Sequence, residues 1–574
     1  MDMGMATGMA MANKAKKTGL RAMSVGAMAT SNLIQNSPCL MAGLMLASMA
    51  LPVWAQSAEF PGEGQSTTSQ VSEGGVSSSA MNKVGSDGIG SGIASNLKRA
   101  WSVTPRVTVT ETLTDNVEAG SSSKQRDQIT EIAPGILING ESARLKGRLD
   151  YQLHEMVYAQ NSQRNQTQQS LNSFGTLEAI EKWLFVDASG MISQQSISAF
   201  GSQSASNTSV NSNRTETSSF QVSPYVRGKV GSFADYDLRY RRAMTRSKSD
   251  LASDVDTDGL TANVRGVLSQ LNLDWSLEGS SQRVDYSRGR TSEEDRLRGV
   301  LSYRFDPQFS VSINGGTESN DYASLTKERK TNSGFGFEWA PTERTRLAVS
   351  KESRFFGEGH SLSFSHRTPL MAITYSDSRD ISVLPNQFTS ITGTNYDLLF
   401  SQLTSQIPDP VARDQQVNNL LQKIGLPRDA IGTAGFLASQ VSVQRLRMLS
   451  LALNGVRNVV TFIATQSESQ SLGVATSLVD DFALSPTIKQ RGYNVNWSYL
   501  ISPLSSVNAV ASQQDSISQT AANLDSRQKT LTFNFMTKLG GKTTLTLGAR
   551  RAIFDRALSP YTENAMIGTI SIQF

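Results

Sequence analysis

The feature that most constrains the fold is a regular alternation of short and long connections between segments of about ten to sixteen residues, from Trp101 to the end of the chain. Within these segments apolar and polar residues alternate, which is the period of a β-strand with one apolar face. Clear examples are 103–110, 145–157, 236–244, 297–305, 334–339 and 531–535. This pattern is typical of an all-β, antiparallel transmembrane barrel.

The connections set the expected number of strands. The short ones are centred near residues 140, 181, 231, 271, 306, 341, 368, 454, 502 and 540, and the longer ones include 112–128, 198–215, 247–257, 319–330 and 470–486. Ten short turns and eleven longer loops predict 22 strands, within a range of 18 to 24 that the pattern allows. Short turns belong in the periplasm and long loops outside, so both barrel ends are expected on the periplasmic side.

The last eleven residues, 564–574, fit the closing strand of such a barrel, because apolar and mostly polar positions alternate up to a final aromatic residue. We predict that Ile570, Ile572 and Phe574 form the terminal signal for the barrel-insertion machinery. The match is incomplete, since Gly568 lies four residues before Ile572 and Ile572 is not aromatic. Taken alone, the segment could also be an edge strand of a soluble sheet.

The beginning of the chain predicts export. Four basic residues precede an apolar run over 40–51, and small residues lead up to Ala55, so residues 1–55 are predicted to be a cleaved signal peptide. The run is shorter than the roughly 20 residues that a membrane-spanning helix needs. Residues 56–99 are rich in Ser and Gly and are expected to be a flexible periplasmic segment, followed by the barrel over 100–574. Cys39, the single cysteine, lies inside the signal, so no disulfide is expected in the mature chain.

Charge excludes one class of partner. The full chain carries +4, and residues 1–55 hold four basic residues against Asp2, so the mature chain carries about +1. Nucleic-acid binding would need a strong basic excess, so it is not expected. No motif predicts a cofactor.

Tryptophan positions support the strand map. The five tryptophans outside the signal are Trp101, Trp183, Trp275, Trp339 and Trp497, and each lies within a few residues of a predicted periplasmic strand end. They are predicted to form one interfacial girdle. Core tryptophans of a soluble sandwich are the alternative, but these would have no reason to gather at one end of the strands.

Residues 379–438 form a connection far longer than a hairpin needs, and such loops are usually functional. Apolar residues follow helical spacing over 396–407 and again over 417–424, with Pro408 and Pro410 between them. The pattern predicts a helical extracellular insert of two amphipathic helices. Their apolar faces would pack on the barrel mouth, on the lumen wall or on each other.

Several basic residues are predicted to face the lumen because they alternate with apolar residues that face lipid, where a charge at the bilayer midplane costs about 2–4 kcal/mol. They are Arg144, Lys146, Arg148, Arg239, Arg241, Arg296, Arg298, Arg304, Arg344 and Arg346. They would form either a functional track or, as we expect, a solvated lumen with mutually paired charges, since Asp150, Asp235 and Asp237 share that face.

Two further patterns suggest chemistry. The segment 254–259 begins like a calcium loop, but Arg265 stands where the bidentate Glu should be, so a polar loop is the better interpretation and no metal site is expected. The three histidines are His154, His360 and His366, and two of them lie near serines. Serine is so common here that this proximity is weak support for a hydrolase, and we expect no enzymatic activity.

The opening segments carry a family resemblance. Residues 101–111, the Thr-Asp-Asn-Val sequence at 114–117, the Ile-Ala-Pro-Gly sequence at 132–135 and the Phe-Val-Asp-Ala sequence at 185–188 resemble the outer-membrane barrels associated with PEP-CTERM/exosortase systems. The resemblance extends from about residue 100 to the end. It implies a barrel in the bacterial outer membrane that acts beside exopolysaccharide export machinery, and it implies no catalytic residues.

We therefore expect a passage or assembly platform for an exopolysaccharide, with outer-membrane lipid, the insertion machinery and periplasmic export components as partners. A general diffusion porin and a non-conducting structural surface anchor are the alternatives. An energised nutrient transporter would need a folded plug, and the segment before Trp101 is too short and too low in complexity to form one.

Overall fold

The computed structural model describes residues 101–119, 123–383, 435–473, 480–520, 522–557 and 559–574, together with nine residues between 396 and 421. All of them belong to one compact unit, Ser95–Phe574. The predicted signal peptide (1–55), the whole segment between it and Trp101, and most of the insert lie outside the described residues.

The described chain is almost entirely β-strand. The strands are Trp101–Thr114 (β1), Asp127–Glu141 (β2), Leu145–Tyr158 (β3), Gln166–Ile180 (β4), Leu184–Ser196 (β5), Arg214–Val230 (β6), Ala234–Ser247 (β7), Val255–Leu268 (β8), Leu273–Tyr286 (β9), Ser292–Asp306 (β10) and Phe309–Asn320 (β11). They continue with Glu328–Thr342 (β12), Thr345–Arg354 (β13), Gly357–Arg367 (β14), Met371–Ser382 (β15), Ser442–Asn454 (β16), Asn458–Ser471 (β17), Thr487–Ser502 (β18), Ser505–Ser518 (β19), Ser526–Lys538 (β20), Thr543–Arg556 (β21) and Tyr561–Gln573 (β22). Outside the long insert, the described helices are short: Ser162–Arg164 (η1), Ser269–Leu271 (η2), Asp481–Leu484 (α4) and Ala522–Leu524 (η3).

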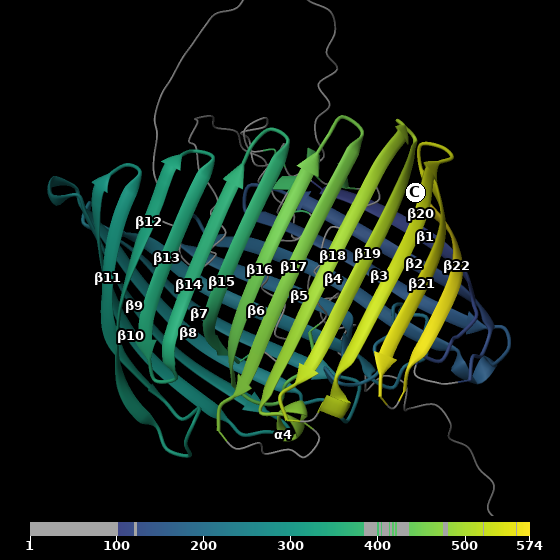
Figure 1. The fold of residues 1–574 in the computed structure, drawn as a ribbon. Coiled ribbons are helices and arrows are strands. Elements are labelled where there is room, and N and C mark those ends of the chain that lie inside the picture. The colour runs from purple at the N-terminus through teal and green to yellow at the C-terminus, as the bar shows by residue number, and fades with distance from the viewer. Residues whose placement is uncertain are drawn as a thin grey trace, which may run out of the picture. The chain divides into compact units, whose positions relative to one another are not determined.

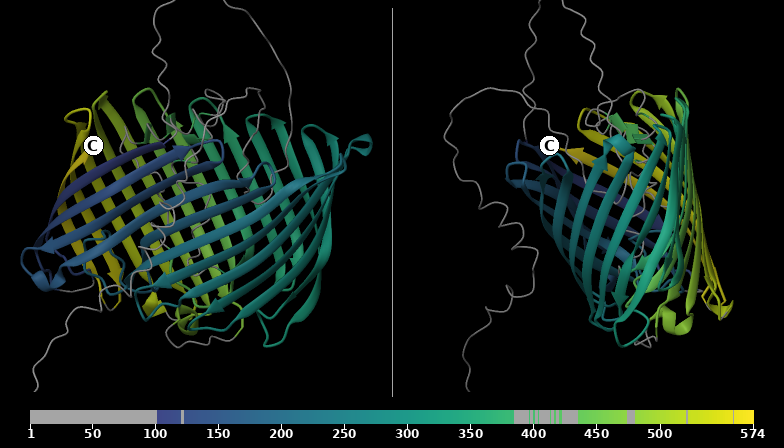
Figure 2. Two further views of the ribbon diagram at one scale, coloured as in Figure 1. Left: turned by 180° about the vertical axis from the view of Figure 1, so that it is seen from behind. Right: turned by 90° about the vertical axis from the view of Figure 1, so that its left-hand side faces the viewer.

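These strands close into a single barrel. They form one 22-stranded sheet in which sequence neighbours pair antiparallel, and β1 pairs with β22 (Figures 1 and 2). The closing seam runs from the pair Arg106 and Gln573 to the pair Thr114 and Ala565. The predicted 22-stranded antiparallel barrel is confirmed.

The two rims of the barrel differ, as predicted. Each connection after an even-numbered strand has two to four residues, and α4 and the longer connections lie at the opposite end (Figure 1). We call these ends the short-turn rim and the loop rim. One expected loop is absent, because Phe355 and Phe356 alone join β13 to β14, the two shortest strands. Gly357, with φ of 97°, provides the left-handed backbone that this reversal needs.

The outer face of the barrel shows why the alternation exists. In β10, Leu297 and Leu301 are 51% and 41% exposed on that face. All five predicted girdle tryptophans lie at or near strand ends on the short-turn rim. At Gly140, opposite Trp101, an added Cβ would lie 2.0 Å from the indole, so only glycine leaves room for this ring.

Within the described part of the chain, no helix is both long enough and apolar enough to cross a membrane. The predicted Ile570 and Ile572 point outward in β22, paired with Val109 and Val107, and Phe574 donates its backbone N–H to Pro105 O at 2.9 Å. Their role in insertion stays a prediction.

Candidate functional site: the lumen wall and the loops across its mouth

The ten predicted lumen residues fall into two groups. Eight lie in strands, on the face opposite the exposed apolar residues: Lys146 and Arg148 in β3, Arg239 and Arg241 in β7, Arg296, Arg298 and Arg304 in β10, and Arg346 in β13. For the other two, the lumen-facing orientation stays a prediction. Arg144 and Arg344 lie in short turns, where the strand has ended and alternation no longer sets the direction of a side chain.

Carboxylates from neighbouring strands neutralise most of these charges. Glu352 of β13 binds both Arg296, at 2.7 Å, and Arg298, at 3.5 Å. Further pairs join Arg239 to Asp187 at 2.8 Å, Arg304 to Asp274 at 2.9 Å, Arg346 to Glu338 at 2.8 Å, Lys146 to Glu141 at 2.7 Å and Arg148 to Asp150 at 3.6 Å. The arrangement resembles a solvated lumen with paired charges more than a track of free cations.

An aromatic stack crosses this part of the wall between β5, β6 and β7. The rings of Phe185 and Tyr225 stack with centroids 5.1 Å apart. The Arg227 guanidinium lies 4.2 Å from the centre of the Phe185 ring, and that of Arg239 lies 3.8 Å from the centre of the Tyr225 ring. These contacts hold the arginines against the wall. Sequence reasoning missed the stack because its members come from three strands.

Phe174 is the unusual side chain of the lumen. It pairs across the sheet with Arg148 on one side and Ser189 on the other, so it faces the lumen, and 57% of it is exposed. Met191, two positions from Ser189 on the same face of β5, is 42% exposed. A large apolar surface left open among charged and hydroxyl groups is a common mark of a binding site.

One histidine forms the constellation of a serine hydrolase. His154 Nδ1 lies 2.6 Å from Glu131 Oε1, and His154 Nε2 lies 3.2 Å from Ser170 Oγ. However, Ser170 lies in the middle of β4 and pairs within the sheet, where backbone N–H groups are engaged in the strand ladder. The strand around Ser170 therefore offers no pair of free N–H groups to stabilise an oxyanion.

The other candidate sites from the sequence are also accounted for. His360 contacts Asp377 at 3.0 Å on the outer face, and His366 contacts Thr345 at 2.8 Å. Asp256 binds Arg246 at 2.6 Å, and Asp258 binds Arg242, so both serve as ion-pair partners. Among the described residues, no three His, Cys, Asp or Glu side chains gather as a metal site.

The lumen face of β16–β19 has a different character from that of β1–β13. It carries no charged residue, and Ser450, Thr461, Asn496 and Ser498 on it are fully buried. We call this face the uncharged wall and the lumen face of β1–β13 the charged wall.

The described residues of the long insert pack on the uncharged wall. Those between 396 and 421 are helical, and Leu399, Leu403, Val417 and Leu421 form an apolar cluster with Val459 of β17. Val459 follows the short turn after β16, so this contact lies near the short-turn rim. The prediction of an extracellular insert is therefore wrong for these residues. The lumen wall, one of the partners expected from the sequence, is the one that these residues contact, although the insert begins and ends at the loop rim.

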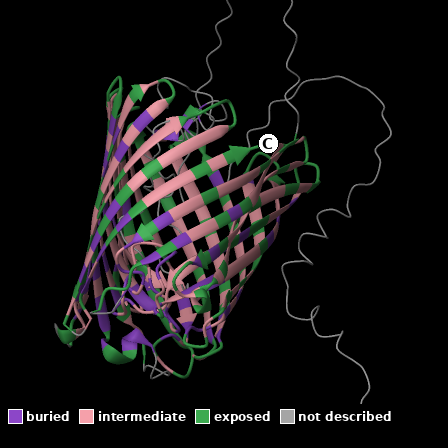
Figure 3. Cartoon of the chain, turned by 90° about the vertical axis from the view of Figure 1, so that its right-hand side faces the viewer, coloured by how far each residue is buried: buried purple, intermediate pink, exposed green. Residues whose placement is uncertain are grey.

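At the loop rim, connections from opposite sides of the barrel meet. Ser198 Oγ and the Ala199 N–H, in the loop after β5, each donate to the Asp481 carboxylate of α4 at 2.6 Å. Phe200, Phe436 and Phe482 bury one another around this contact. The β5–β6 and β17–β18 loops are about half a ring apart in the strand order, and buried residues gather at this end (Figure 3). The described loops thus bridge the mouth. We call the β5–β6 loop, the end of the insert around Phe436 and the β17–β18 loop with α4 the loop layer.

Two more contacts strengthen this loop layer. The Tyr561 hydroxyl donates to Gln203 O, and the Tyr158 hydroxyl donates to Thr208 O at 2.6 Å. A short parallel bridge joins Ser196 to Phe436. The β5–β6 loop is therefore tied to β3, to β22 and to the end of the insert.

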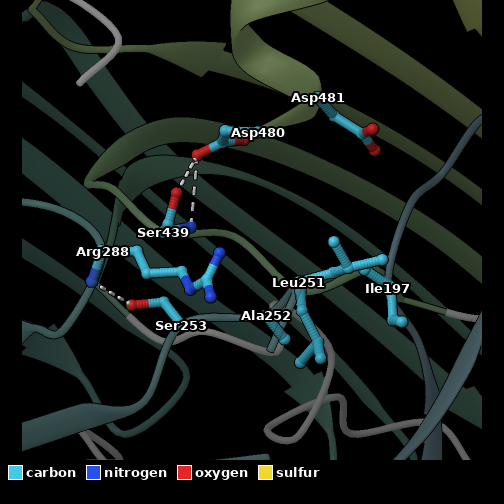
Figure 4. A pocket seen from close by; sticks show the side chains of 9 residues that line it. Ile197, Leu251, Ala252, Ser253, Arg288, Ser439, Asp480 and Asp481 are labelled. Carbon is cyan, nitrogen blue, oxygen red and sulfur yellow. Dashed lines mark hydrogen bonds between the residues drawn. The ribbon is translucent and has the colours of Figure 1, made fainter. Parts of the chain in front are cut away.

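A small pocket among these loops is lined by charged residues, Arg288, Asp480 and Asp481 (Figure 4). Asp480 accepts hydrogen bonds from the hydroxyl and the backbone N–H of Ser439, and the Arg288 side chain lies on the pocket wall. The pKa of Asp481 is raised to about 6, chiefly by burial and also by the charge of Asp480, and the hydrogen bonds from Ser198 and Ala199 oppose this rise. The bridge thus contains a group that titrates near neutral pH.

No protein-family model and no curated protein matches the chain. Among solved structures it is similar to the FrpB iron transporter of Neisseria meningitidis, at 10% identity and a TM-score of 0.45, over 83% of this chain and 82% of that one. It is also similar to the siderophore receptor PirA of Acinetobacter baumannii, at 10% identity and 0.43, covering 82% and 80%. A third is the ferric enterobactin receptor PfeA of Pseudomonas aeruginosa, at 9% and 0.41, covering 82% and 80%.

The closed strand ring, the apolar outer face and the polar lumen define the class of protein. The chain is a β-barrel protein of the bacterial outer membrane.

Proposed function

We propose that this barrel is a passage for a hydrated polysaccharide, closed at rest by the loop layer. The observation that carries the proposal is Phe174, an aromatic ring that is 57% exposed on a lumen wall where most of the side chains around it are charged, amide or hydroxyl groups. The face of a sugar ring that carries C–H groups packs on an aromatic side chain, while its hydroxyl groups bind carboxylates, guanidinium groups and amides.

The surroundings of Phe174 fit such a ligand. Arg148 and Asp150 lie on the same face of β3, and Asn172 lies two residues before Phe174 on β4. Because Asp150 is paired with Arg106 and Arg148, the wall combines polarity with little net charge. A neutral or weakly charged polymer could slide along it without being held by a free ion.

The family resemblance supplies the identity of the polymer in this proposal. It favours an exopolysaccharide made beside a PEP-CTERM/exosortase system, with periplasmic export components feeding the short-turn rim. The loop layer must part for the chain to leave, so the contact between Ser198 and Asp481 would act as the closure.

The two alternatives predict different behaviour. A general diffusion porin would conduct at all times, which the contacts across the mouth do not favour. A structural surface anchor would neither conduct nor respond to polysaccharide.

Planar-bilayer recordings test the proposal. We expect the wild-type barrel to open intermittently and a soluble neutral polysaccharide to interrupt the current. Phe174→Ala should raise the concentration needed for half-block about tenfold, since an exposed aromatic contact is worth on the order of 1 kcal/mol or more. Phe174→Tyr, which keeps the ring, should retain block.

The control is Phe233→Ala, which removes an exposed ring from a short turn outside the strands and should leave block unchanged. Equal block in wild type and Phe174→Ala would remove the basis of the proposal. A barrel that never conducts would favour the anchor, and steady conduction insensitive to polysaccharide would favour the porin.

A further inference from the structure

The outer face of the barrel carries a repeated pattern of paired cations on alternate strands. Two basic residues, two positions apart, lie on the outer face of each strand: Arg445 and Arg447 in β16, Lys489 and Arg491 in β18, and Arg527 and Lys529 in β20. The next outward position in each strand is apolar or aromatic: Leu449, Tyr493 and Leu531. We call these six basic residues the cation rows.

Strand pairing establishes that the cation rows face outward. Tyr493 and Leu531 are 44% and 57% exposed, and the rows share their faces because they lie two and four positions away. Arg491 pairs with Asp515 of β19, which in turn pairs with Arg527 of β20. The cation rows of β18 and β20 are therefore linked across the outer wall through Asp515 of β19, which lies between them.

The cation rows lie at the outer edge of the hydrocarbon band. From Arg491 to Ile501 there are ten residues, roughly 33 Å along the strand and about 25 Å along the membrane normal at a tilt near 40°. This is the height of the lipid-facing band of an outer-membrane barrel. Trp497 lies toward the short-turn end, so the rows mark the opposite, extracellular edge.

The charge of this region is not balanced within the protein. The outer face of β15–β20 carries seven basic residues against three acidic ones, Asp377, Glu468 and Asp515. Asp377 binds both Arg445 and Arg447, at 2.7 and 3.2 Å, and Asp515 binds Arg527 at 2.7 Å. Arg491 and Lys529 have no ion pair within the described part of the chain.

The opposite outer wall shows that this excess is local. At the same edge, β7–β10 carry three basic residues, Arg242, Arg246 and Arg283, against five acidic ones. All three basic residues form ion pairs there, with Asp258, Asp256 and Asp285. The outer edge of the barrel thus has a cationic excess on one side and, on the other, an acidic excess in which every cation is paired.

We infer that the cation rows bind a phosphorylated glycolipid of the outer leaflet. Arginine recognises phosphate with two parallel hydrogen bonds, and lysine adds a point charge. Alternate strands are about 10 Å apart, a spacing comparable with the length of a disaccharide, so neighbouring rows can each take one phosphate of a doubly phosphorylated disaccharide. Leu449, Tyr493 and Leu531 would contact its acyl chains.

Native mass spectrometry of the full-length barrel in detergent tests this inference. The probe is lipid A, with its two phosphates, beside enzymatically dephosphorylated lipid A and inorganic phosphate. We expect a one-to-one adduct with lipid A that the dephosphorylated form does not give. Arg491→Gln combined with Lys529→Gln, which breaks no ion pair, should weaken that adduct at least tenfold.

Arg242→Gln combined with Arg283→Gln serves as the matched control, because it removes two outward cations from the other wall and should leave the adduct intact. Heat-modifiable gel migration checks that each variant is folded. Equal adducts with both lipid forms, equal loss in both double variants, or displacement by millimolar inorganic phosphate would each overturn the inference.

Discussion

The charged wall and the uncharged wall are both built from antiparallel strands, of 10–17 and 13–16 residues respectively, yet they meet different surroundings. On the charged wall, Arg296 and Arg298 share Glu352, and their side chains remain 20% and 24% exposed. On the uncharged wall, Thr461 and Asn496 are fully buried, and Val459 packs on apolar residues of the insert. The ion pairs of the charged wall stay in contact with solvent. The short uncharged side chains of the other wall can be covered without burying an unpaired charge.

The outer faces show the reverse contrast. Two of the three strands that carry the cation rows, β16 and β18, belong to the uncharged wall. On the outer face of β7–β10, in the charged wall, three basic residues all form ion pairs beside five acidic ones. The uncharged wall therefore carries its charge on the outer face only, whereas the charged wall carries charge on both faces. The difference teaches that lumen and membrane contacts are set separately for the two faces of a strand.

The largest effect is expected at the seam where strands from the two halves of the ring join. Deleting Phe574 removes the backbone N–H that binds Pro105 O beside the β1–β22 ladder. We expect export to continue while the barrel accumulates in the periplasm or is degraded. Cell fractionation measures this, with Phe574→Tyr as a control that keeps the aromatic end.

Normal outer-membrane levels of the deletion variant would show that closure of the two halves does not depend on the terminal residue. An equal loss of outer-membrane protein in the Phe574→Tyr variant would mean that insertion requires an aromatic ring without a hydroxyl at this position, not only the backbone N–H.

A charge on the uncharged wall should cost nearly as much. Val459→Asp places a carboxylate among Leu399, Leu403, Val417 and Leu421, where it has no partner in the cluster. We expect a loss of roughly 3–5 kcal/mol, taken up by release of the insert from the wall. Single-channel conductance should then rise.

The same carboxylate on the charged wall is the control. Ser189→Asp adds it beside the exposed Phe174 and should change the unfolding temperature little. Unchanged conductance in a folded Val459→Asp barrel would mean that the contact does not obstruct the lumen.

The bridge between the two halves should respond to pH. Asp481 has a pKa of about 6 in the folded loop layer against 3.8 as the ordinary value, so the folded form binds more protons between these values. Its stabilising effect is fully present below pH 3.8 and is lost as the pH rises through 6, by roughly 3 kcal/mol in all.

Open probability in planar bilayers should therefore increase between pH 4 and pH 7. Asp481→Asn, which is neutral throughout, should flatten that increase. A pH profile identical to that of the wild type would assign the titration to another group.

The smallest effect concerns the paired ions of the charged wall. Glu352→Gln leaves Arg296 and Arg298 without their shared carboxylate, which should cost roughly 1–3 kcal/mol and make the lumen more selective for anions. Reversal potentials in a salt gradient measure the selectivity. Glu358→Gln, whose side chain is 70% exposed, should shift neither quantity, and an equal shift would show that overall charge, not lumen position, decides selectivity.

The sequence predicted the parts of this fold that depend on local alternation. The number of strands, the positions of the short turns and the location of the tryptophans at strand ends follow from the period of two and from the turn residues. Both signals lie in residues that are close together in the sequence. For Arg144 and Arg344 the alternation gives no side-chain direction, since both residues lie in turns. Contacts between distant segments could not be read in this way.

Those distant contacts are the ones that distinguish the site. Nothing near His154 in the chain indicates that Glu131 and Ser170 will flank it. Nothing within the alternation of β4 shows that Phe174 stays uncovered, because its exposure depends on what the other strands place opposite. The location of the insert against Val459 likewise depends on the closed ring.

The ties across the mouth also order the assembly of the molecule in time. Ser198 and Asp481 are 283 positions apart, and Tyr561 and Gln203 are 358 apart. Such distant partners carry a large loop-closure entropy and meet only once the strands between them are in register. An open-mouthed barrel must therefore precede the finished one during insertion, and a polymer or a chaperone present at that stage could be trapped inside before the loops join.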